Sequence, residues 1–475
     1  MSLQFHNTRT RQVEPFTPLH DEQVSLYTCG PTVYNSLHVG NWAAYVYWDT
    51  LVRTLTNAGL KVNRVMNITD VGHLVSDGDD GEDKLEKGAR REGKTAWEVA
   101  QHYTDDFIQG MEALNLTPAD HLVKATDFIP QQLELVRTLK SKGHTYEIID
   151  GIYFDTSTFP SYGAFAHLDL EAQKAGARVE FNPEKRNPSD FALWKFTPHG
   201  TTRDMQWLTP ADLTDDGTEK QGFPGWHLEC SAMAMDLLGP SIDIHTGGID
   251  HIPVHHTNEI AQSEAATGKR FSNVWLHNNH LKVNGTKISK SLENGYTLQD
   301  IAEQGFTAMD LRLFILQSHY RTEGNFTFEL LEAAQARLRR WKAVATLRHQ
   351  VQGDATPEDF QEHVASIASA LQDDLNTPVA LSHVDEVFDA LEQHGLQLAA
   401  EPITEALETV DNLLGLRLME STPDISEHAK TLIKRREMAR ENKDWAASDA
   451  LRDELVAQYI TIRDTADGSI WEYAS

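Results

Sequence analysis

The sequence is poor in cysteine, having only Cys29 and Cys230 among 475 residues. A disulfide framework is therefore excluded, and a reducing cytoplasm is favoured. Long apolar runs are also absent, since none approaches the roughly 20 residues that a membrane span needs. Residues 1–16 lack the apolar segment of a secretory signal. We therefore expect a cytoplasmic protein without a membrane partner.

Positive charge is the next deficit. Lys and Arg number 42 against 71 Asp and Glu, which gives a formal net charge of −29. Such a chain is a poor candidate for coating nucleic acid non-specifically, because phosphate binding needs neutralising cations. Local basic clusters occur at residues 337–342 and 434–443, and runs of this kind are usually solvated helix faces.

One stretch, residues 225–259, is instead rich in side chains that bind metals. Zinc takes thiolate, imidazole and carboxylate ligands, and the candidates in this stretch are Cys230, His245, His251, His255, His256 and Glu259. His255 and Glu259 are four apart, so on a helix they share one face and His256 points elsewhere. A tetrahedral site then needs a fourth ligand from another part of the chain. The alternative is a buried cysteine among ordinary polar histidines.

The amino-terminal half alternates strand-like and helix-like segments. Residues 24–29 predict a buried strand, residues 39–57 a helix and residues 61–70 a second strand, with a glycine-proline turn at 30–32. Strand-like sequence resumes at 241–251, after an insertion of short strands and turns at about 143–224. The predicted fold is a doubly wound, parallel-sheet (Rossmann-like) α/β domain.

Two short motifs suit a nucleotide triphosphate. HVGN starts the predicted helix, where backbone N–H groups face a phosphate: His38 can donate to it, Gly40 leaves room for adenine and Asn41 offers an amide. KISKS lies in a later loop, where Lys287 and Lys290 can stabilise charge on the departing pyrophosphate. A plain basic turn is the alternative for the second motif.

Further ligand contacts are predicted at the carboxyl ends of strands, where open α/β sheets bind ligands. Thr69 follows the second strand, and Gly247 and Gly248 follow the strand near residue 244. The Gly/Asp-rich segment 72–83 lacks the twelfth-position Glu of a calcium loop, so an exposed acidic loop is expected there.

Beyond residue 326 the chain is predicted to be helical. Apolar residues recur at intervals of three and four over 328–350, 358–372, 378–396 and 402–417, which is typical of a helical bundle. A small carboxyl-terminal domain follows, with one long basic helix starting near residue 431 and a strand-like tail.

Taken together, HVGN and KISKS resemble the paired signatures of class I aminoacyl-tRNA synthetases. More specific segments, among them YTCGPTVYN, NPSDFALWK, GWHLECSAM, HTGGIDHIPVHHTNE and DDLNTPVAL, resemble the cysteinyl-tRNA synthetase family over about residues 22–475. The resemblance implies activation of L-cysteine with ATP and Mg²⁺, followed by transfer to the terminal adenosine of tRNA(Cys), by a monomer.

The resemblance also implies a set of site residues. The zinc ligands, for one Zn²⁺ per chain, would be Cys29, Cys230, His255 and Glu259, with Cys29 as the fourth ligand. His38, Asn41, Lys287 and Lys290 would be catalytic. Gly40, Gly247 and Gly248 would join them at ATP, and Thr69 and Trp226 would line the cysteine pocket. Asn41 stands where this family usually has histidine.

By the same resemblance the chain divides into six parts. These are a first half of the catalytic domain (1–134), a connective insertion (135–224), a second half with the zinc ligands (225–260), a stem-contact region with the KISKS loop (261–330), a tRNA-binding helical bundle (331–424) and an anticodon-region domain (425–475).

Three other functions compete. A cysteine-activating ligase of the mycothiol type would pass the adenylate to an amino sugar, but it would need no extended docking surface such as 331–475. A catalytically silent RNA-binding relative would not need both signatures and a full ligand set. A thiol protease using Cys230 and His255 would need an orienting third group in a known signature.

Overall fold

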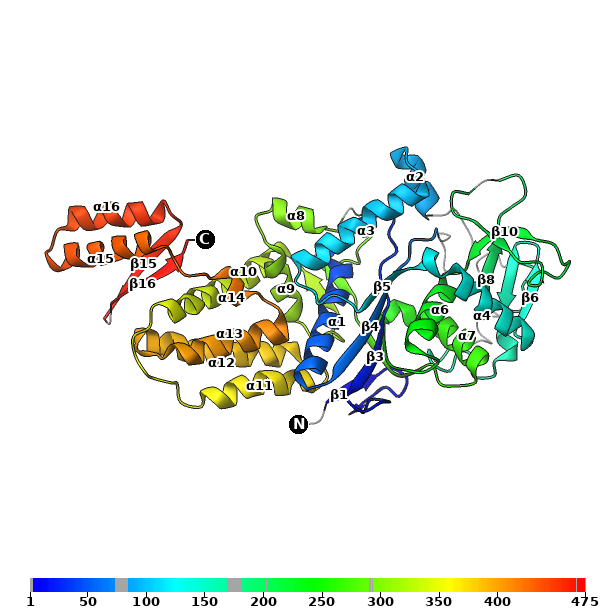
Figure 1. Ribbon diagram of the computed structural model, residues 1–475, viewed down its shortest axis with the longest axis horizontal. Helices are drawn as coiled ribbons and strands as arrows, with labels where there is room; N and C mark the ends of the chain where they lie inside the picture. Colours follow the sequence, from blue (N-terminus) through cyan, green and yellow to red (C-terminus); the bar gives the residue numbers. More distant parts are fainter. Residues whose placement is uncertain are drawn as a thin grey trace.

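The computed structural model describes residues 3–72, 84–168, 182–201, 203–289, 292, 294–466 and 468–474. Lys290 and most of the acidic segment 72–83 lie outside these ranges. The molecule is elongated (Figure 1): an antiparallel sheet lies at one end, a parallel sheet in the middle, then a helical bundle, and a small carboxyl-terminal domain at the other end.

The central sheet has five parallel strands, as the alternating sequence predicted. In sheet order they are β12 (Ser272–Asn278), β11 (Ile242–Gly248), β3 (Gln23–Thr28), β4 (Lys61–Ile68) and β5 (His121–Lys124). β3 lies between β4, which follows it in sequence, and β11, which comes more than 200 residues later. The strand order therefore reverses beside β3, and in doubly wound sheets such a reversal opens a ligand crevice at the carboxyl ends of the strands.

Helices and a short hairpin surround this sheet. They are α1 (Val39–Asn57), α2 (Lys84–Glu92), α3 (Ala96–Ala113), η1 (Ala125–Phe128), α4 (Ile129–Ser141), α6 (Trp226–Leu238), η3 (Ile249–His251), η4 (Ile252–His256), α7 (Thr257–Thr267), β1 (Gln4–Asn7) and β2 (Gln12–Pro15). Helix α1 runs over the predicted residues, because a capping box formed by His38 and Asn41 starts it and Gly59 follows with φ 85°.

The insertion forms its own antiparallel sheet. Its strands are, in order, β6 (Thr145–Ile148), β7 (Gly151–Phe154), β8 (Phe191–Phe196), β10 (Lys220–Pro224) and β9 (Trp207–Thr209), with η2 (Thr156–Thr158) after β7. Strand β8 is buried along its whole length and packs in a core with residues of α4 and α6. Because β10 runs directly into α6, the insertion fixes the start of the helix that carries Cys230.

The carboxyl-terminal half is helical and confirms the predicted bundle. Its elements are β13 (Leu281–Val283), α8 (Leu298–Glu303), α9 (Ala308–Leu316), β14 (Gly324–Phe326), α10 (Phe328–Ala345), η6 (Thr346–His349), α11 (Phe360–Gln372), α12 (Thr377–His394), η7 (Gly395–Gln397), α13 (Ala400–Leu414) and α14 (Leu418–Ser421). The basic residues of α10 are largely paired within the bundle, as Arg337 is with Asp385 and Arg340 with Glu392.

The prediction of one long basic helix at the carboxyl terminus was wrong. Two helices occur, α15 (Glu427–Glu441) and α16 (Trp445–Val456), packed against the hairpin β15 (Ile460–Thr465) and β16 (Gly468–Tyr473). Lys443 takes φ 58° between them, and the Asp444 side chain accepts from the Ala447 N–H to start α16. A left-handed residue followed by an N-cap ends one helix and begins the next, although helical periodicity continues across the break.

A buried ion pair joins the parallel-sheet region to the bundle. Arg312 of α9 contacts Asp49 of α1, and both side chains are inaccessible to solvent. Arg312 also donates to the carbonyl of Leu414 at 2.6 Å and to that of Leu114 at 2.7 Å. Burial by itself raises the pKa of Asp49, but Arg312 and Arg53 hold it well below its ordinary value. Helix α1 is thus fixed to the bundle near its middle, about three turns after His38.

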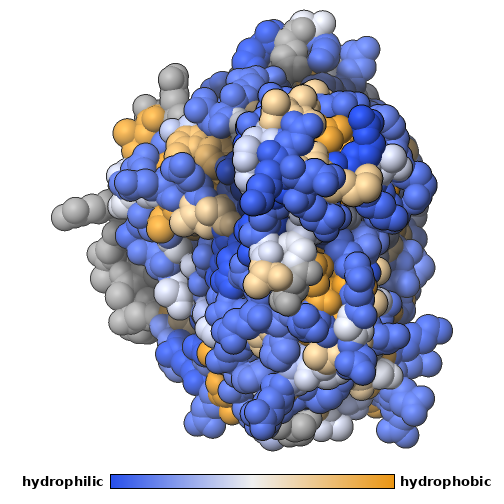
Figure 2. All heavy atoms as spheres, turned by 90° about the vertical axis from the view of Figure 1, so that its left-hand side faces the viewer, coloured by the Kyte–Doolittle hydropathy of each residue, from blue (hydrophilic) through white to orange (hydrophobic). Residues whose placement is uncertain are grey.

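No helix within the described ranges has both the length and the apolar character required to traverse a bilayer. The face at the carboxyl-terminal end is mainly hydrophilic, with apolar atoms in separate small patches (Figure 2). Exposed large apolar side chains of this domain are Met438, Trp445, Val456, Tyr459 and Tyr473.

Candidate functional site

Four potential zinc ligands meet where the order of the parallel strands reverses. Cys29 follows β3, Cys230 lies in α6, His255 is in η4 and Glu259 is in the first turn of α7. One donor atom from each lies within 4.8 Å of the others, and all four side chains are buried. The structure therefore brings together four residues that span 230 positions of sequence.

The four side chains have shifted pKa values, and the shifts differ in direction. A hydrogen bond from Cys29 lowers the pKa of Cys230 to about 6, whereas burial raises the pKa of Cys29. His255 Nε2 lies 2.9 Å from Glu259 Oε1. Burial by itself lowers the pKa of His255, but Glu259 and Cys230 outweigh it and raise this pKa to about 10. The site thus collects thiolate and carboxylate charge, which is what a divalent cation would neutralise.

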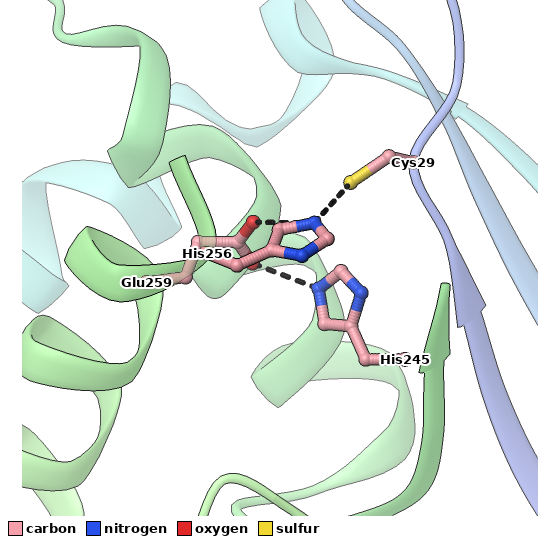
Figure 3. A group of neighbouring side chains, drawn as sticks. All are labelled: Cys29, His245, His256 and Glu259. Atoms are coloured by element: carbon pink, nitrogen blue, oxygen red, sulfur yellow. Dashed lines mark hydrogen bonds and ion pairs between the residues drawn. The ribbon is translucent and has the colours of Figure 1, made fainter. Parts of the chain in front are cut away.

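The prediction that His256 points away from the site was wrong. Its Nε2 lies 3.4 Å from Cys29 Sγ and 3.9 Å from Glu259 Oε1, and Figure 3 shows it directed toward both. The cause is local, because residues Ile252–His256 form a π-helical turn, wider than an α-turn, before α7 begins. The wider turn lets two consecutive histidines, His255 and His256, face the same pocket.

Other histidines orient these two. His227 Nδ1 lies 2.9 Å from His255 Nδ1, so the Nε2 atom of His255 faces Glu259. His277 Nε2 lies 2.7 Å from His256 Nδ1, and the Thr8 hydroxyl lies 2.7 Å from His277 Nδ1. Partners of this kind fix the orientation of a metal-binding imidazole and tune its affinity.

Two overlapping donor sets are possible at this site. The first contains Cys29, Cys230, His255 and Glu259; the second keeps Cys29 and Glu259 but uses His245 and His256 (Figure 3). The first offers two sulfur ligands and so suits Zn²⁺ better than harder cations. A third group, with His363, His383 and Glu386, lies in the bundle and is half-exposed.

Trp226 contacts one of the four potential zinc ligands, whereas Thr69 directly follows β4. The half-buried Trp226 ring stacks on His255, with ring centroids 4.4 Å apart, so it covers one face of the imidazole. Thr69 is buried, and its hydroxyl accepts from the Asn67 amide at 2.9 Å. Next to it, burial raises the pKa of Asp70 to about 6.

The HVGN motif forms the start of α1. The Asn41 N–H donates to His38 Nδ1 at 3.3 Å, and the His38 N–H donates to Asn41 Oδ1 at 3.2 Å. Burial lowers the pKa of His38, so the ring is neutral and, with Nδ1 accepting, its proton is on Nε2. The first turn of α1 carries no acidic residue. This helix start can therefore receive a phosphate, with His38 donating through Nε2.

The two signatures are in contact. A Cβ atom at Gly40 would lie 2.9 Å from Ile288 Cδ1. The loop that carries Lys287 and Ile288, called the lysine loop below, therefore packs closely on the HVGN turn. The Val39 N–H donates to the Tyr296 carbonyl at 2.8 Å, and Ser289 N–H donates to Asn294 Oδ1 at 2.9 Å. Lys287 is exposed on this loop. Lys290 lies outside the described residues.

Gly247 and Gly248 lie at the carboxyl end of β11, beside the histidines. A side chain at Gly247 would lie 2.6 Å from the His256 ring, and one at Gly248 would lie 2.4 Å from Asp250 Oδ1. These glycines keep the strand end flat against η3 and η4. The adenosine contact expected of them stays a prediction.

Sequence reasoning did not find His227 and His277. His227 is three residues before Cys230, so it shares a helix face with that ligand. His277 is paired with Gly247 in the parallel ladder of β11 and β12. Only the register of two strands about 30 residues apart places His277 beside His256, and that register is not visible in the sequence.

Two family models match parts of the chain. Residues 15–336 match the model of the tRNA synthetases class I (C) catalytic domain, and residues 422–471 match the model of the cysteinyl-tRNA ligase anticodon binding domain. The parallel sheet, the paired signature loops and the first match define a class I aminoacyl-tRNA synthetase.

Curated relatives cover nearly the whole chain. A cysteine–tRNA ligase of Burkholderia lata is 42% identical over 98% of this chain and 96% of its own. One of Treponema denticola is 39% identical over 99% of this chain and 100% of its own. The chain belongs to the cysteine–tRNA ligase family.

Solved structures of other synthetases share the fold. Methionyl-tRNA synthetase of Mycobacterium tuberculosis, in complex with methionyl-adenylate, superposes with a TM-score of 0.62 at 14% identity, covering 84% of this chain and 92% of its own. A leucyl-tRNA synthetase of Agrobacterium radiobacter gives 0.60 at 12% identity, covering 86% of each chain.

Proposed function

We propose that this chain is a cysteine–tRNA ligase that activates L-cysteine with MgATP and transfers it to the terminal adenosine of tRNA(Cys). The observation that carries the proposal is the buried group of Cys29, Cys230, His255 and Glu259. Relatives at about 40% identity over nearly their full length carry the same name.

The four buried donors suit one Zn²⁺ ion per chain. An ion held by these residues would supply a Lewis-acidic centre that favours a thiolate over a hydroxyl. The chain's own residues do the rest: Glu259 and Cys230 bring negative charge, His227 orients His255, and Trp226 covers the imidazole. Selection of cysteine over serine therefore takes place at binding, where a pocket without a metal would separate such similar side chains by only about 10–200-fold.

ATP would lie between the two signature loops. His38 donates to a phosphate oxygen through Nε2, Asn41 offers its amide, and the Gly40 turn admits the adenine. Lys287 and Lys290, three residues apart in sequence, stabilise the charge that develops as the cysteine carboxylate attacks the α-phosphate and pyrophosphate leaves. Positioning and charge stabilisation carry this step, so no general base is assigned.

The acceptor is tRNA rather than an amino sugar. The chain continues for more than 100 residues beyond β14 as a bundle and a small terminal domain, and residues 422–471 match an anticodon-binding model. A small acceptor would need neither part. The predicted division into catalytic, stem-contact and tRNA-binding regions belongs to this proposal. So does a cytoplasmic location, which the two free cysteines support. A monomer is part of it too, because one chain supplies all four donor groups.

The test combines metal analysis with exchange kinetics. Purified protein should contain about one zinc per chain and should exchange labelled pyrophosphate into ATP when cysteine is added, but not with serine. Removal of the metal by a strong chelator should abolish exchange, and Zn²⁺ should restore it. Undiminished cysteine-dependent exchange in metal-free, folded protein would contradict selection by zinc.

A further inference from the structure

Asp374 lies at the turn between α11 and α12, in the DDLNTP segment, which the proposed site does not use. Its side chain is buried, with 3% of the residue exposed. Asp374 and Leu375 take φ values of 54° and 52°, in the left-handed region that non-glycine residues seldom adopt. Two such residues in succession persist only where surrounding contacts hold them.

The Asp374 carboxylate makes those contacts with two other segments. Tyr320 donates its hydroxyl to Oδ1 at 2.6 Å, and the His6 N–H of β1 donates to the same oxygen at 2.7 Å. Arg321 donates from Nε to Oδ2 at 2.7 Å, and its Nη2 lies 2.6 Å from that oxygen. One buried carboxylate thus joins the bundle to the amino-terminal strand and to the segment after α9.

From that segment a continuous set of hydrogen bonds leads to the lysine loop. Asn279 donates its N–H to the Tyr320 carbonyl at 2.8 Å and its amide to the Arg321 carbonyl at 3.0 Å. The chain then enters β14, which pairs in parallel with β13, and the Asn284 N–H donates to the Phe326 carbonyl at 3.0 Å. Strand β13 ends four residues before Lys287.

We propose that Asp374 is a positioning residue for Lys287: it fixes Tyr320 and Arg321, they fix β14 against β13, and β13 sets the lysine loop over the ATP site. This inference rests on the proposed function, because Lys287 is assigned to pyrophosphate departure there. It gives the buried turn of the bundle a role in adenylate formation, at a distance from the reacting atoms.

The test replaces Asp374 by asparagine, which accepts left-handed backbone but lacks the negative charge. In cysteine-dependent pyrophosphate exchange, Asp374→Asn should lower kcat by about 10–100-fold, the effect of a displacement of about 1 Å. KM for cysteine should change less than about twofold and zinc content should stay at one per chain, because the metal site is built by other elements. Asp373→Asn is the matched control, since Asp373 is exposed beside it, and it should leave kcat unchanged.

A second comparison separates positioning from general destabilisation. If Asp374 acts through the lysine loop, Asp374→Asn should cost little more in a Lys287→Ala background, because both changes then remove the same contribution. Should Asp374→Asn fail to fold, Tyr320→Phe removes one hydrogen bond of the same carboxylate and should still lower kcat severalfold at constant KM for cysteine.

Three results would overturn the proposal: an unchanged kcat in the folded variants, equal losses in Asp373→Asn and Asp374→Asn, or fully additive losses with Lys287→Ala. Wild-type protein without cysteine-dependent exchange would instead contradict the proposed function itself. Active wild-type protein with unaffected variants would contradict only the role of Asp374.

Discussion

The metal-binding pocket and the lysine loop serve the same proposed reaction but are built in different ways. The pocket is buried, and its donors come from the parallel sheet and the helices directly attached to it. Lys287 is exposed and depends on contacts that reach it through β13, β14 and the bundle. The difference teaches that the residues that select the amino acid are positioned by the core of the parallel-sheet domain. The position of the lysine that acts on the phosphates depends instead on contacts with distant parts of the chain.

The strongest way to break this comparison is Cys230→Ser. Cys230 belongs to the donor set that we assign to zinc and not to the second set, so its loss should remove zinc and lower cysteine-dependent exchange by more than the 10–100-fold typical of an outer partner. Zinc content and exchange rate are the measurements. His256→Asn, which alters only the second set, serves as the control; if it removed zinc while Cys230→Ser kept it, the second set would be the binding site.

Next in size is Lys287→Ala. Loss of one preorganised contact to developing charge costs about 100–1,000-fold in kcat, and we expect this range for pyrophosphate exchange. Zinc content and KM for cysteine should stay near wild-type values, because the pocket is assembled independently of the loop. A variant that lost zinc as well would show that the two regions are not separate.

A smaller effect is expected from His227→Asn, which removes the partner of His255 Nδ1. Metal affinity should fall about 10–100-fold, measured by competition with a zinc-binding dye, while the protein saturated with zinc should keep most of its activity. Unchanged affinity would mean that the pocket holds His255 without this hydrogen bond.

The smallest expected effect on the proposed reaction comes from Asp49, which pairs with Arg312 and joins α1 to the bundle. The pKa of Asp49 is held low in the folded protein, so its ionisation stabilises the fold above pH 4, and this contribution is lost as the pH falls through the ordinary Asp range and below. Asp49→Asn should therefore flatten the pH dependence of unfolding between about pH 5 and 3, measured with urea at each pH. An equal slope in wild type and variant would refute the assignment.

The parallel sheet and helix α1 could be predicted because their signals are local. Residues 39–57 show helical periodicity, and the strands before and after them are short apolar runs. The ligand set needed the family resemblance, since nothing local connects Cys29 to Cys230.

What the sequence could not predict depended on local geometry or on strand register. His256 was assigned to the wrong side because a regular helix was assumed where the chain makes a π-turn. The break near Lys443 was missed because a left-handed residue interrupts a pattern that continues in phase. His277 reaches the pocket only through the pairing of β11 with β12.

The π-turn at Ile252–His256 makes the length of this segment a constraint of its own. Deleting one residue there would restore an ordinary α-helical turn, in which consecutive side chains point about 100° apart. His255 and His256 could then not both face the pocket, although the ligands outside the deleted position would still be encoded. A substitution in this stretch should therefore disturb the metal-binding pocket less than the deletion of one residue. A homologue shorter by one residue here would have to build its pocket differently.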